Sequence, residues 1–191
     1  VVDTLVYVAG NTSSDDLPGT SGNFQPTRVS GTVDAFVSSA DALLTSPVNS
    51  TYIGGNGDED VRSIANTGAD GSLVYLAGDT ASTDFPGTTT GTENNSFIAY
   101  INKDLAAVTD YEAVYVGGDN NDTLWDLAIH SESILFNQDT DTVYVTGGTN
   151  SAAFPNSADG EDEFLTGAED AFLLRIDATL SDTADIQMTY L

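Results

Sequence analysis

The sequence has 191 residues, of which 40% are hydrophobic, and its 30 acidic residues against four lysines and arginines give a formal net charge of -26. This balance excludes nucleic acid and disfavours an anionic membrane surface as partners, because both are bound through clustered cations. No apolar run approaches the roughly 20 residues that span a bilayer, so we expect no membrane insertion. The absence of cysteine excludes disulfides and thiolate metal sites.

The first predicted element is a short strand that leads into a loop, and the same segment occurs three times. It reads VYVAGNTSSDDLP from Val6, VYLAGDTASTDFP from Val74 and VYVTGGTNSAAFP from Val143. Short β-branched and aromatic runs that end in glycine are typical of strands rather than helices. The three starts are about 68 residues apart, which indicates an internal repeat.

Further predicted strands follow in the same order in each copy. The second reads DAFVSSADALL from Asp34, NSFIAYINKDL from Asn95 and DAFLLRIDATL from Asp170. The third reads STYIGG from Ser50, AVYVGG from Ala113 and MTYL from Met188. In the first two copies a weaker fourth strand follows, VRSIAN or LWDLAIH.

Four short antiparallel strands in each repeat predict one blade of a β-propeller. The repeats cover about residues 3–69, 70–139 and 140–191, and only three strands are predicted in the third. We therefore expect an all-β protein, a single repeat domain over 1–191. It is built from antiparallel four-stranded propeller-type blades in about three repeats, with the last blade incomplete.

The opening segment itself reads as structural. Its glycine ends the strand, its threonine and serine hydroxyls can satisfy loop amides, and an apolar residue before proline pins the loop to the blade. The hydroxyl residues are Thr12, Ser14, Thr80, Ser82, Thr149 and Ser151, and the apolar ones are Leu17, Phe85 and Phe154.

Together these segments resemble the bacterial seven-bladed β-propeller repeat, whose units look like VYVTG-T-S-DFP, DAFV-K and TYLGG-GDD. The matching stretches are Val143–Pro155, Asp170–Ile176, Ser50–Asp60 and Val61–Ala65, with counterparts in the other copies. The resemblance implies an extracellular or cell-surface protein without a common enzymatic activity, and it carries over no catalytic residue. The chain departs from the pattern in repeat length, in lacking lysine after DAF, and in having fewer copies than a closed propeller of four to eight blades.

A blade without its edge strand exposes unpaired backbone groups that a longer propeller or another copy of the chain could cover by strand addition. The segments expected at this contact are Val1, Val2, Met188, Thr189, Tyr190 and Leu191. The favoured hypothesis is a non-enzymatic extracellular structural or scaffold protein that self-assembles head to tail into a surface filament or ring. The alternative is a carbohydrate- or ligand-binding adhesin module from a longer propeller. Its contacts would come from loops 19–33, 87–94 and 156–169, with Phe24 and Phe164 as the available aromatic side chains.

Chemistry-bearing motifs are sparse. No GxSxG, HExxH or phosphate-binding loop occurs, and His130 is the sole histidine, so we expect no enzymatic activity. Calcium is the expected small partner, because the turns GGNGDED and GGDNNDT offer clustered oxygen ligands at Asp58, Asp60, Asp119 and Asp122. The same aspartates could instead cap backbone amides in the turns. Four sequons, at Asn11, Asn49, Asn94 and Asn121, predict glycosylation. Glycans are also a candidate binding partner.

Overall fold

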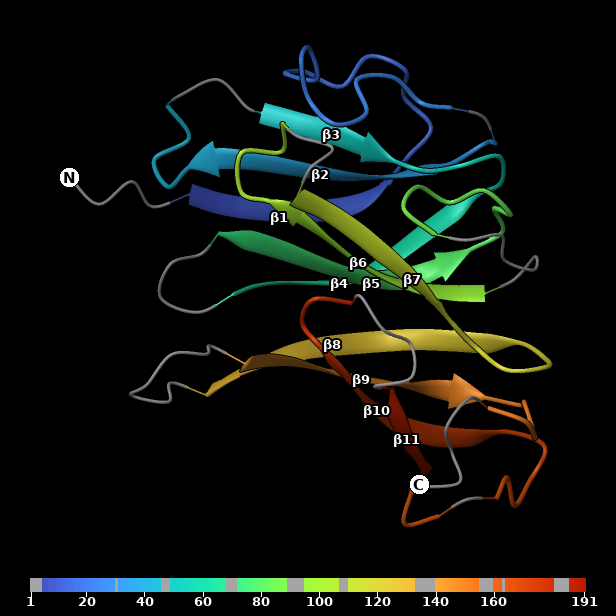
Figure 1. The fold of residues 1–191 in the computed structure, drawn as a ribbon. Coiled ribbons are helices and arrows are strands. Elements are labelled where there is room, and N and C mark those ends of the chain that lie inside the picture. Colours follow the sequence, from blue (N-terminus) through green and yellow to red (C-terminus); the bar gives the residue numbers. More distant parts are fainter. Residues whose placement is uncertain are drawn as a thin grey trace.

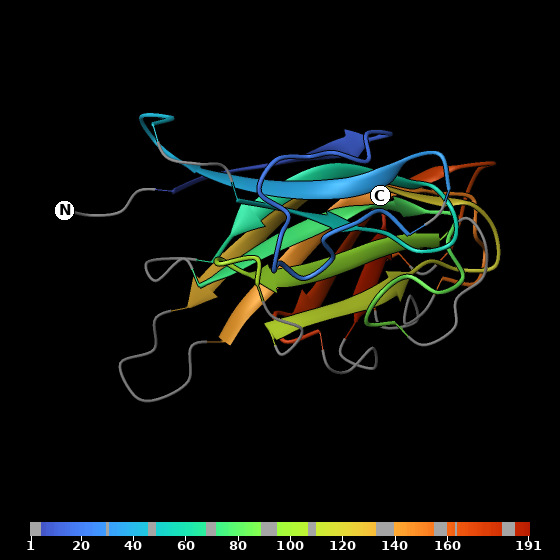
Figure 2. The same ribbon diagram turned by 90° about the horizontal axis from the view of Figure 1, so that it is seen from above.

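The computed structural model describes residues 5–29, 31–45, 49–67, 72–88, 95–106, 110–132, 140–154, 160–162, 164–180 and 186–191. Within these residues the fold is all-β, as expected, with antiparallel strands in three sheets (Figure 1). No helix in this part of the chain is long and apolar enough to cross a membrane. Successive sheets stack face to face, and their strands run at different angles when viewed from above (Figure 2).

Each sheet consists of consecutive strands. Sheet 1 contains β1 (Leu5–Thr12), β2 (Asp34–Asp41) and β3 (Asn49–Ile53). Sheet 2 contains β4 (Glu59–Asn66), β5 (Leu73–Thr80), β6 (Asn95–Asn102) and β7 (Tyr111–Val116). Sheet 3 contains β8 (Asp122–Glu132), β9 (Thr140–Thr149), β10 (Asp170–Asp177) and β11 (Gln187–Tyr190).

The sequence repeat and the sheets are offset by one strand. The weak fourth strand of the first repeat is β4, and it pairs with β5 of the next sheet rather than with β3; β8 pairs with β9 in the same way. The expectation that the last blade is incomplete is therefore wrong. Sheet 3 has four strands, and sheet 1 is the sheet with three described strands. A Gly-Gly turn connects β3 to β4 and β7 to β8, and so leads from one sheet to the next. The repeat in the sequence does not reveal this change of sheet.

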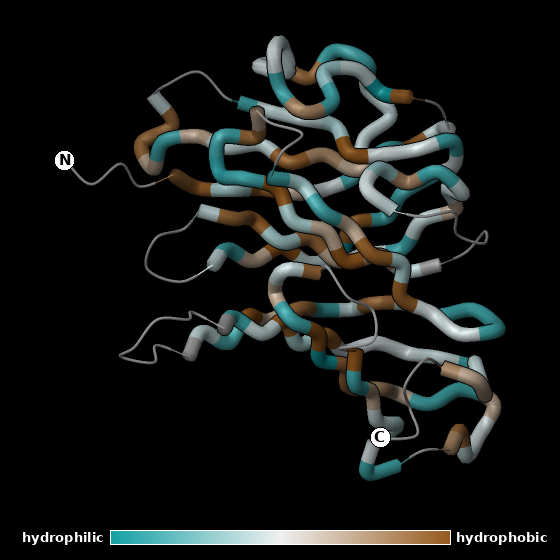
Figure 3. The backbone as a smooth tube through the Cα atoms, in the orientation of Figure 1, coloured by the Kyte–Doolittle hydropathy of each residue, from teal (hydrophilic) through white to brown (hydrophobic). Residues whose placement is uncertain are grey.

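The hydrophobic core consists of two layers, one between each pair of neighbouring sheets. Val37 of β2 packs with Leu76 and Phe97 between sheets 1 and 2. Ile98 of β6 and Phe172 of β10 belong to the layer between sheets 2 and 3. Because both faces of sheet 2 are covered, its central strand β5 is almost continuously buried. Hydrophobic residues follow the strands and hydrophilic ones gather in loops (Figure 3).

A leucine after β2, β6 and β10, the second strand of each sequence repeat, adopts the left-handed backbone conformation. Leu44, Leu105 and Leu180 have φ angles of 55°, 56° and 52°. In each turn the leucine N–H donates to the carbonyl three residues earlier, at 2.9–3.1 Å. This conformation costs about 1 kcal/mol for a residue with a Cβ. The burial of Leu105 and Leu180 between sheets offsets that cost.

A tyrosine in β3, β7 and β11, the third strand of each sequence repeat, holds the loop that follows the first strand of the same repeat. The hydroxyl of Tyr52 donates to the Ser14 carbonyl at 2.9 Å and accepts the Leu17 N–H at 3.0 Å. Tyr115 makes the same pair of bonds with Ser82 and Phe85. In sheet 3 the hydroxyl of Tyr190 donates to the Ser151 carbonyl at 2.9 Å, and the backbone N–H of Phe154 bonds to the same hydroxyl. The expected apolar plugs Phe85 and Phe154 pack against Phe97 and Phe172 with tilted rings, at ring-centroid distances of 4.4 and 5.0 Å.

Replacing Tyr190 by Phe should lower the free energy of unfolding by about 1–3 kcal/mol, because a buried carbonyl loses its donor. Urea denaturation followed by circular dichroism measures this change. Tyr144→Phe is the control, since the Tyr144 hydroxyl makes no hydrogen bond with the described residues. Equal stabilities of the two variants would contradict the structural role of the tyrosine.

Candidate functional site

The first strands of sheets 2 and 3, β4 and β8, which we call the inner strands, each begin with a buried acidic residue. This residue binds hydroxyls at the end of the neighbouring strand and just after it. In sheet 2 the Thr80 hydroxyl donates to Glu59 Oε1 at 2.9 Å, and Ser82 donates to the same oxygen. In sheet 3 Thr149 donates to Asp122 Oδ1, and Ser151 donates to Oδ2 at 3.1 Å. We call this arrangement the carboxylate joint. It explains why a threonine and a serine recur two residues apart in the opening segment.

The backbone turn before each inner strand closes against the same loop. Gly57 N donates to the Ser82 hydroxyl and Asn120 N to the Ser151 hydroxyl, both at 2.8 Å. A Cβ on Gly57 would lie 2.5 Å from the carbonyl carbon and oxygen of Ala81, so only glycine permits this approach. The turn and the carboxylate therefore bind the same serine hydroxyl, and this arrangement is repeated in sheets 2 and 3.

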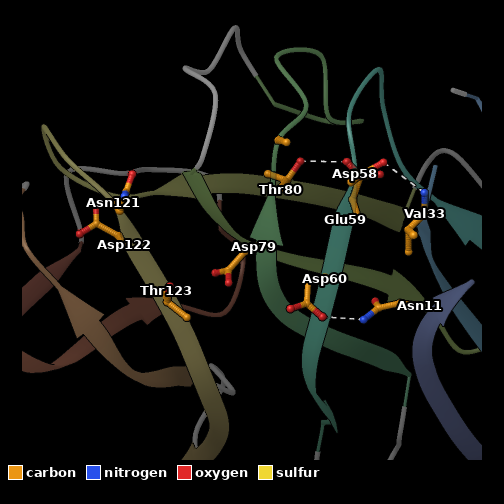
Figure 4. Close-up of a pocket in the computed structure, with 11 residues that line it drawn as sticks. Asn11, Val33, Asp58, Glu59, Asp60, Asp79, Thr80, Asn121, Asp122 and Thr123 are labelled. Atoms are coloured by element: carbon orange, nitrogen blue, oxygen red, sulfur yellow. Dashed lines mark hydrogen bonds between the residues drawn. The ribbon is translucent and has the colours of Figure 1, made fainter. Parts of the chain in front are cut away.

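A pocket of about 610 Å³ lies beside the carboxylate joints, between the ends of β1, β4, β5 and β8 (Figure 4). Its lining is strongly acidic. The lining carboxylates are Asp58, Glu59, Asp60, Asp79 and Asp122, and the lining amides are Asn11 and Asn121. Arg62 is the neighbouring cation: it lies 2.7 Å from Asp60 and 3.0 Å from Asp79.

Three of the four aspartates predicted as calcium ligands surround or face this pocket, and all four accept hydrogen bonds from the protein. Asp58 Oδ1 accepts the N–H groups of Thr32 and Val33, at 2.6 and 3.1 Å. These bonds lower the pKa of Asp58, as expected for a carboxylate that caps a turn. Asp60 accepts from Asn11 at 2.6 Å.

The other two lie in the second turn. Asp119 accepts the Ala153 N–H at 3.3 Å, and Asp122 is the carboxylate of the joint in sheet 3. No group of three or more acidic or histidine side chains within the described residues is arranged to hold a metal ion. The geometry supports the alternative interpretation, in which the turn aspartates serve as hydrogen-bond acceptors.

Glu59 is the most perturbed acidic group of the site. Its side chain is 2% exposed, and burial raises its pKa to about 7 against the lowering effect of the Ser82 and Thr80 hydroxyls. The charge of Asp34, itself fully buried at the start of β2, raises the pKa of Glu59 further. A Cβ on Gly54 would lie 2.5 Å from Glu59 Oε2 and 2.9 Å from Asp34 Oδ2, so both carboxyl groups close over this glycine. Burial also raises the pKa of Asp34.

The sequons differ in how their amide nitrogens are engaged. Asn11 Nδ2 donates to Asp60, and its Oδ1 accepts the Val61 N–H at 2.7 Å, so this side chain links sheet 1 to sheet 2. Asn49 Nδ2 donates to the Asp104 carbonyl at 2.8 Å. Asn121 is exposed in the turn before β8. Asn94 lies outside the described residues.

The segments expected to mediate assembly are not equivalent in the structure. Met188, Thr189 and Tyr190 belong to β11, the edge strand of sheet 3 that pairs with β10, and Met188 and Tyr190 are buried. The side chain of Leu191 is exposed, while its N–H donates to the Ala171 carbonyl at 2.9 Å. Val1 and Val2 lie outside the described residues.

Loop 19–33, predicted as a binding loop, is packed against the sheets. Its Phe24 stacks on Tyr111 of β7 at 4.3 Å, and the backbone of Gln25 binds Tyr52 of β3. Phe164 in the loop before β10 is exposed. His130 is exposed in β8, opposite Thr142 of β9.

Asp122 is among the predicted calcium ligands, whereas its counterpart Glu59 is not, and the aspartates beside Glu59 were predicted in its place. The spacing could have identified it. Glu59 follows Gly54 by five residues, as Asp122 follows Gly117, whereas Asp58 and Asp60 have no acidic counterpart at the same offset. No feature of a single sequence indicates that Glu59 lies opposite Thr80 or that Asp122 lies opposite Thr149.

No family model matches the chain, and a search of curated proteins finds no match to it. The proposed function therefore rests on the geometry of the repeat.

Replacing Glu59 by Gln should make stability less dependent on pH. Because the folded pKa of about 7 lies above that of an unfolded glutamate, the wild type loses stability as pH rises from about 5 to 8, and the variant loses less. We expect the difference in unfolding free energy to change by on the order of 2 kcal/mol over this range. Urea titrations at pH 5, 6, 7 and 8 measure it.

The control for this experiment is Glu161→Gln, which removes one charge at an exposed position. A Glu59→Gln profile parallel to that of the wild type would contradict the assignment of Glu59 as a buried titrating group.

Proposed function

We propose that this chain is a non-enzymatic structural protein, extracellular or on a cell surface. Its copies stack head to tail, with sheet 3 of one copy against sheet 1 of the next, into a filament or ring. One observation carries the proposal. Repeat positions that are buried wherever one sheet meets another are exposed on the outer face of sheet 1, and one such position is exposed on sheet 3.

The outer face of sheet 1, which we call the head face, carries Val6, Val8 and Leu44. They are 44%, 53% and 75% exposed. The residues at the same repeat positions in sheets 2 and 3 are at most 3% exposed, because they pack against the preceding sheet. These residues are Val74, Leu76, Leu105, Val143, Val145 and Leu180. The head face thus presents the surface that two sheets of the same chain bury.

The outer face of sheet 3, the tail face, carries Leu173 of β10. Its side chain is 41% exposed, whereas its counterparts Val37 and Ile98 are fully buried against the following sheet. Head and tail faces are therefore the two halves of one repeated interface. Their contact is heterologous, which generates a ring if the rotation closes and a filament if it does not.

The edge of sheet 1 at β3 and the edge of sheet 3 at β11 offer less for assembly, because loops of the same chain bind them. Ser50 N and Tyr52 N of β3 donate to the carbonyls of Gly19 and Gln25, at 3.1 and 3.0 Å. Tyr190 N of β11 donates to the Asp162 carbonyl at 3.1 Å. Such covering is a common protection against uncontrolled pairing of strands. These contacts leave the stacked faces and the β1 edge of sheet 1 available for growth.

The net charge of -26 opposes this stacking through long-range repulsion between copies. Salt screens such repulsion over about 10 Å at 0.1 M, while contacts between apolar faces persist. Assembly should therefore increase with ionic strength.

Sedimentation velocity at rising salt concentration tests the proposal. Wild type should form oligomers, and two variants should lose them: a head variant, Val8→Thr with Leu44→Asn, and a tail variant, Leu173→Thr. Asparagine suits the left-handed backbone of Leu44, so the turn stays intact. Mixing the head and tail variants should restore dimers, because each retains one unaltered face.

The matched control is Leu43→Asn in the same turn. Leu43 is 82% exposed, but its counterparts are the polar residues Asp104 and Thr179, so it does not belong to the stacking positions. A wild-type chain that stays monomeric at all salt concentrations contradicts the proposal. So does an equal loss of assembly in the Leu43→Asn control.

A further inference from the structure

The free edge of β1 carries the same hydroxyl pair that elsewhere completes a carboxylate joint. Thr12 and Ser14 occupy the repeat positions of Thr80 and Ser82. The local geometry is also the same, since Ser14 N donates to Thr12 Oγ1 at 3.0 Å and Ser82 N donates to Thr80 Oγ1 at 2.9 Å. Within the described residues β2 is the only strand paired with β1.

The hydroxyl of Ser14 is turned to a local acceptor. It donates to Asp16, whereas Ser82 donates to Glu59 of the neighbouring strand. Asp16 has a different partner in the second repeat. Its counterpart Asp84 accepts the N–H of Asn56, from the Gly-Gly turn that precedes β4, at 2.7 Å. Thr12 and Ser14 thus present hydroxyl donors, and Asp16 presents an acceptor. Their counterparts in sheet 2 bind the first residue of β4 and the turn before it.

We propose that the β1 edge binds an antiparallel strand from a neighbouring copy, and that this strand carries an aspartate or glutamate opposite Thr12. The inference rests on the proposed head-to-tail stacking and names what the contact recognises. The carboxylate accepts the hydroxyls of Thr12 and Ser14, while the preceding Gly-Gly turn donates an N–H to Asp16.

The register of the strand follows from the two complete sheets. Glu59 lies opposite Thr80 in one ladder, and Asp122 lies opposite Thr149 in the other. Each inner strand then has a bulge at the same place, at Arg62 and Trp125. A strand in this register on β1 also lies beside β4, as β4 lies beside β8. There the Ser63 hydroxyl binds Asp126 at 2.6 Å.

The side chains explain why an acid is required rather than any extended segment. Two hydroxyl donors that converge on one oxygen, as on Glu59, leave a buried proton unpaired when the acceptor is removed. Hydrogen bonds to a charged group are also stronger than those between neutral groups. Backbone pairing supplies affinity for any strand, and the hydroxyl pair supplies selection of an acidic one.

The test uses a labelled peptide with the sequence of residues 54–66, GGNGDEDVRSIAN, and the full-length Leu173→Thr chain, whose sheet 1 is unaltered. Fluorescence anisotropy and NMR shifts of β1 measure binding. The native peptide should bind, and its Glu59→Ala form should bind at least tenfold more weakly. An Asp58→Ala peptide loses the same charge one residue away and should bind like the native one.

A chain with Thr12→Val and Ser14→Ala should lose the preference between the native and Glu59→Ala peptides, with circular dichroism confirming that it folds. Equal binding of these two peptides to the unaltered chain would overturn the inference and leave the stacking proposal standing. Absence of peptide binding while wild type assembles would also overturn it. Absence of both peptide binding and assembly would overturn the inference and the proposed function together.

Discussion

The fold depends on one repeated interaction, the buried carboxylate at the start of each inner strand. Glu59 and Asp122 each accept two hydroxyl donors from the adjoining strand while sitting at the point where the chain passes from one sheet to the next. A buried carboxylate is unfavourable without hydrogen-bond donors, so the threonine and the serine recur with the acid, and the docking turn closes over them. This coupling accounts for the recurrence of the whole segment rather than of its strands alone.

The second constraint is that a sheet with two apolar faces has to be covered on both. Sheet 2 meets this condition inside the chain, because sheets 1 and 3 pack against its two faces. Sheets 1 and 3 have one covered face each, so Val8 at one end and Leu173 at the other remain exposed. The same physical requirement therefore forms the core and supports the proposed contact between copies. It needs no interaction that the chain does not already make twice.

Most of the fold could be predicted from the sequence because it is local and repeated. The strands, the glycine after the opening run and the plugging role of Phe85 and Phe154 all follow from patterns within a few residues. The pairing of β4 with β5 could not, because a strand looks the same whichever sheet it joins. Among 30 acidic residues, the spacing from Gly54 marks Glu59 as the counterpart of Asp122. Its burial and its hydroxyl partners, in contrast, appear only in the folded chain.

Residue-resolved amide hydrogen exchange in β1, set against β5 and β9, tests the central claim most directly. In dilute chain at low salt, the N–H groups of β1 that face away from β2 should exchange quickly, while those of β5 and β9 stay protected on both sides. In the assembled form β1 should become as protected as the other two strands. Full protection of β1 in the dilute monomer, or none after assembly, would contradict the account.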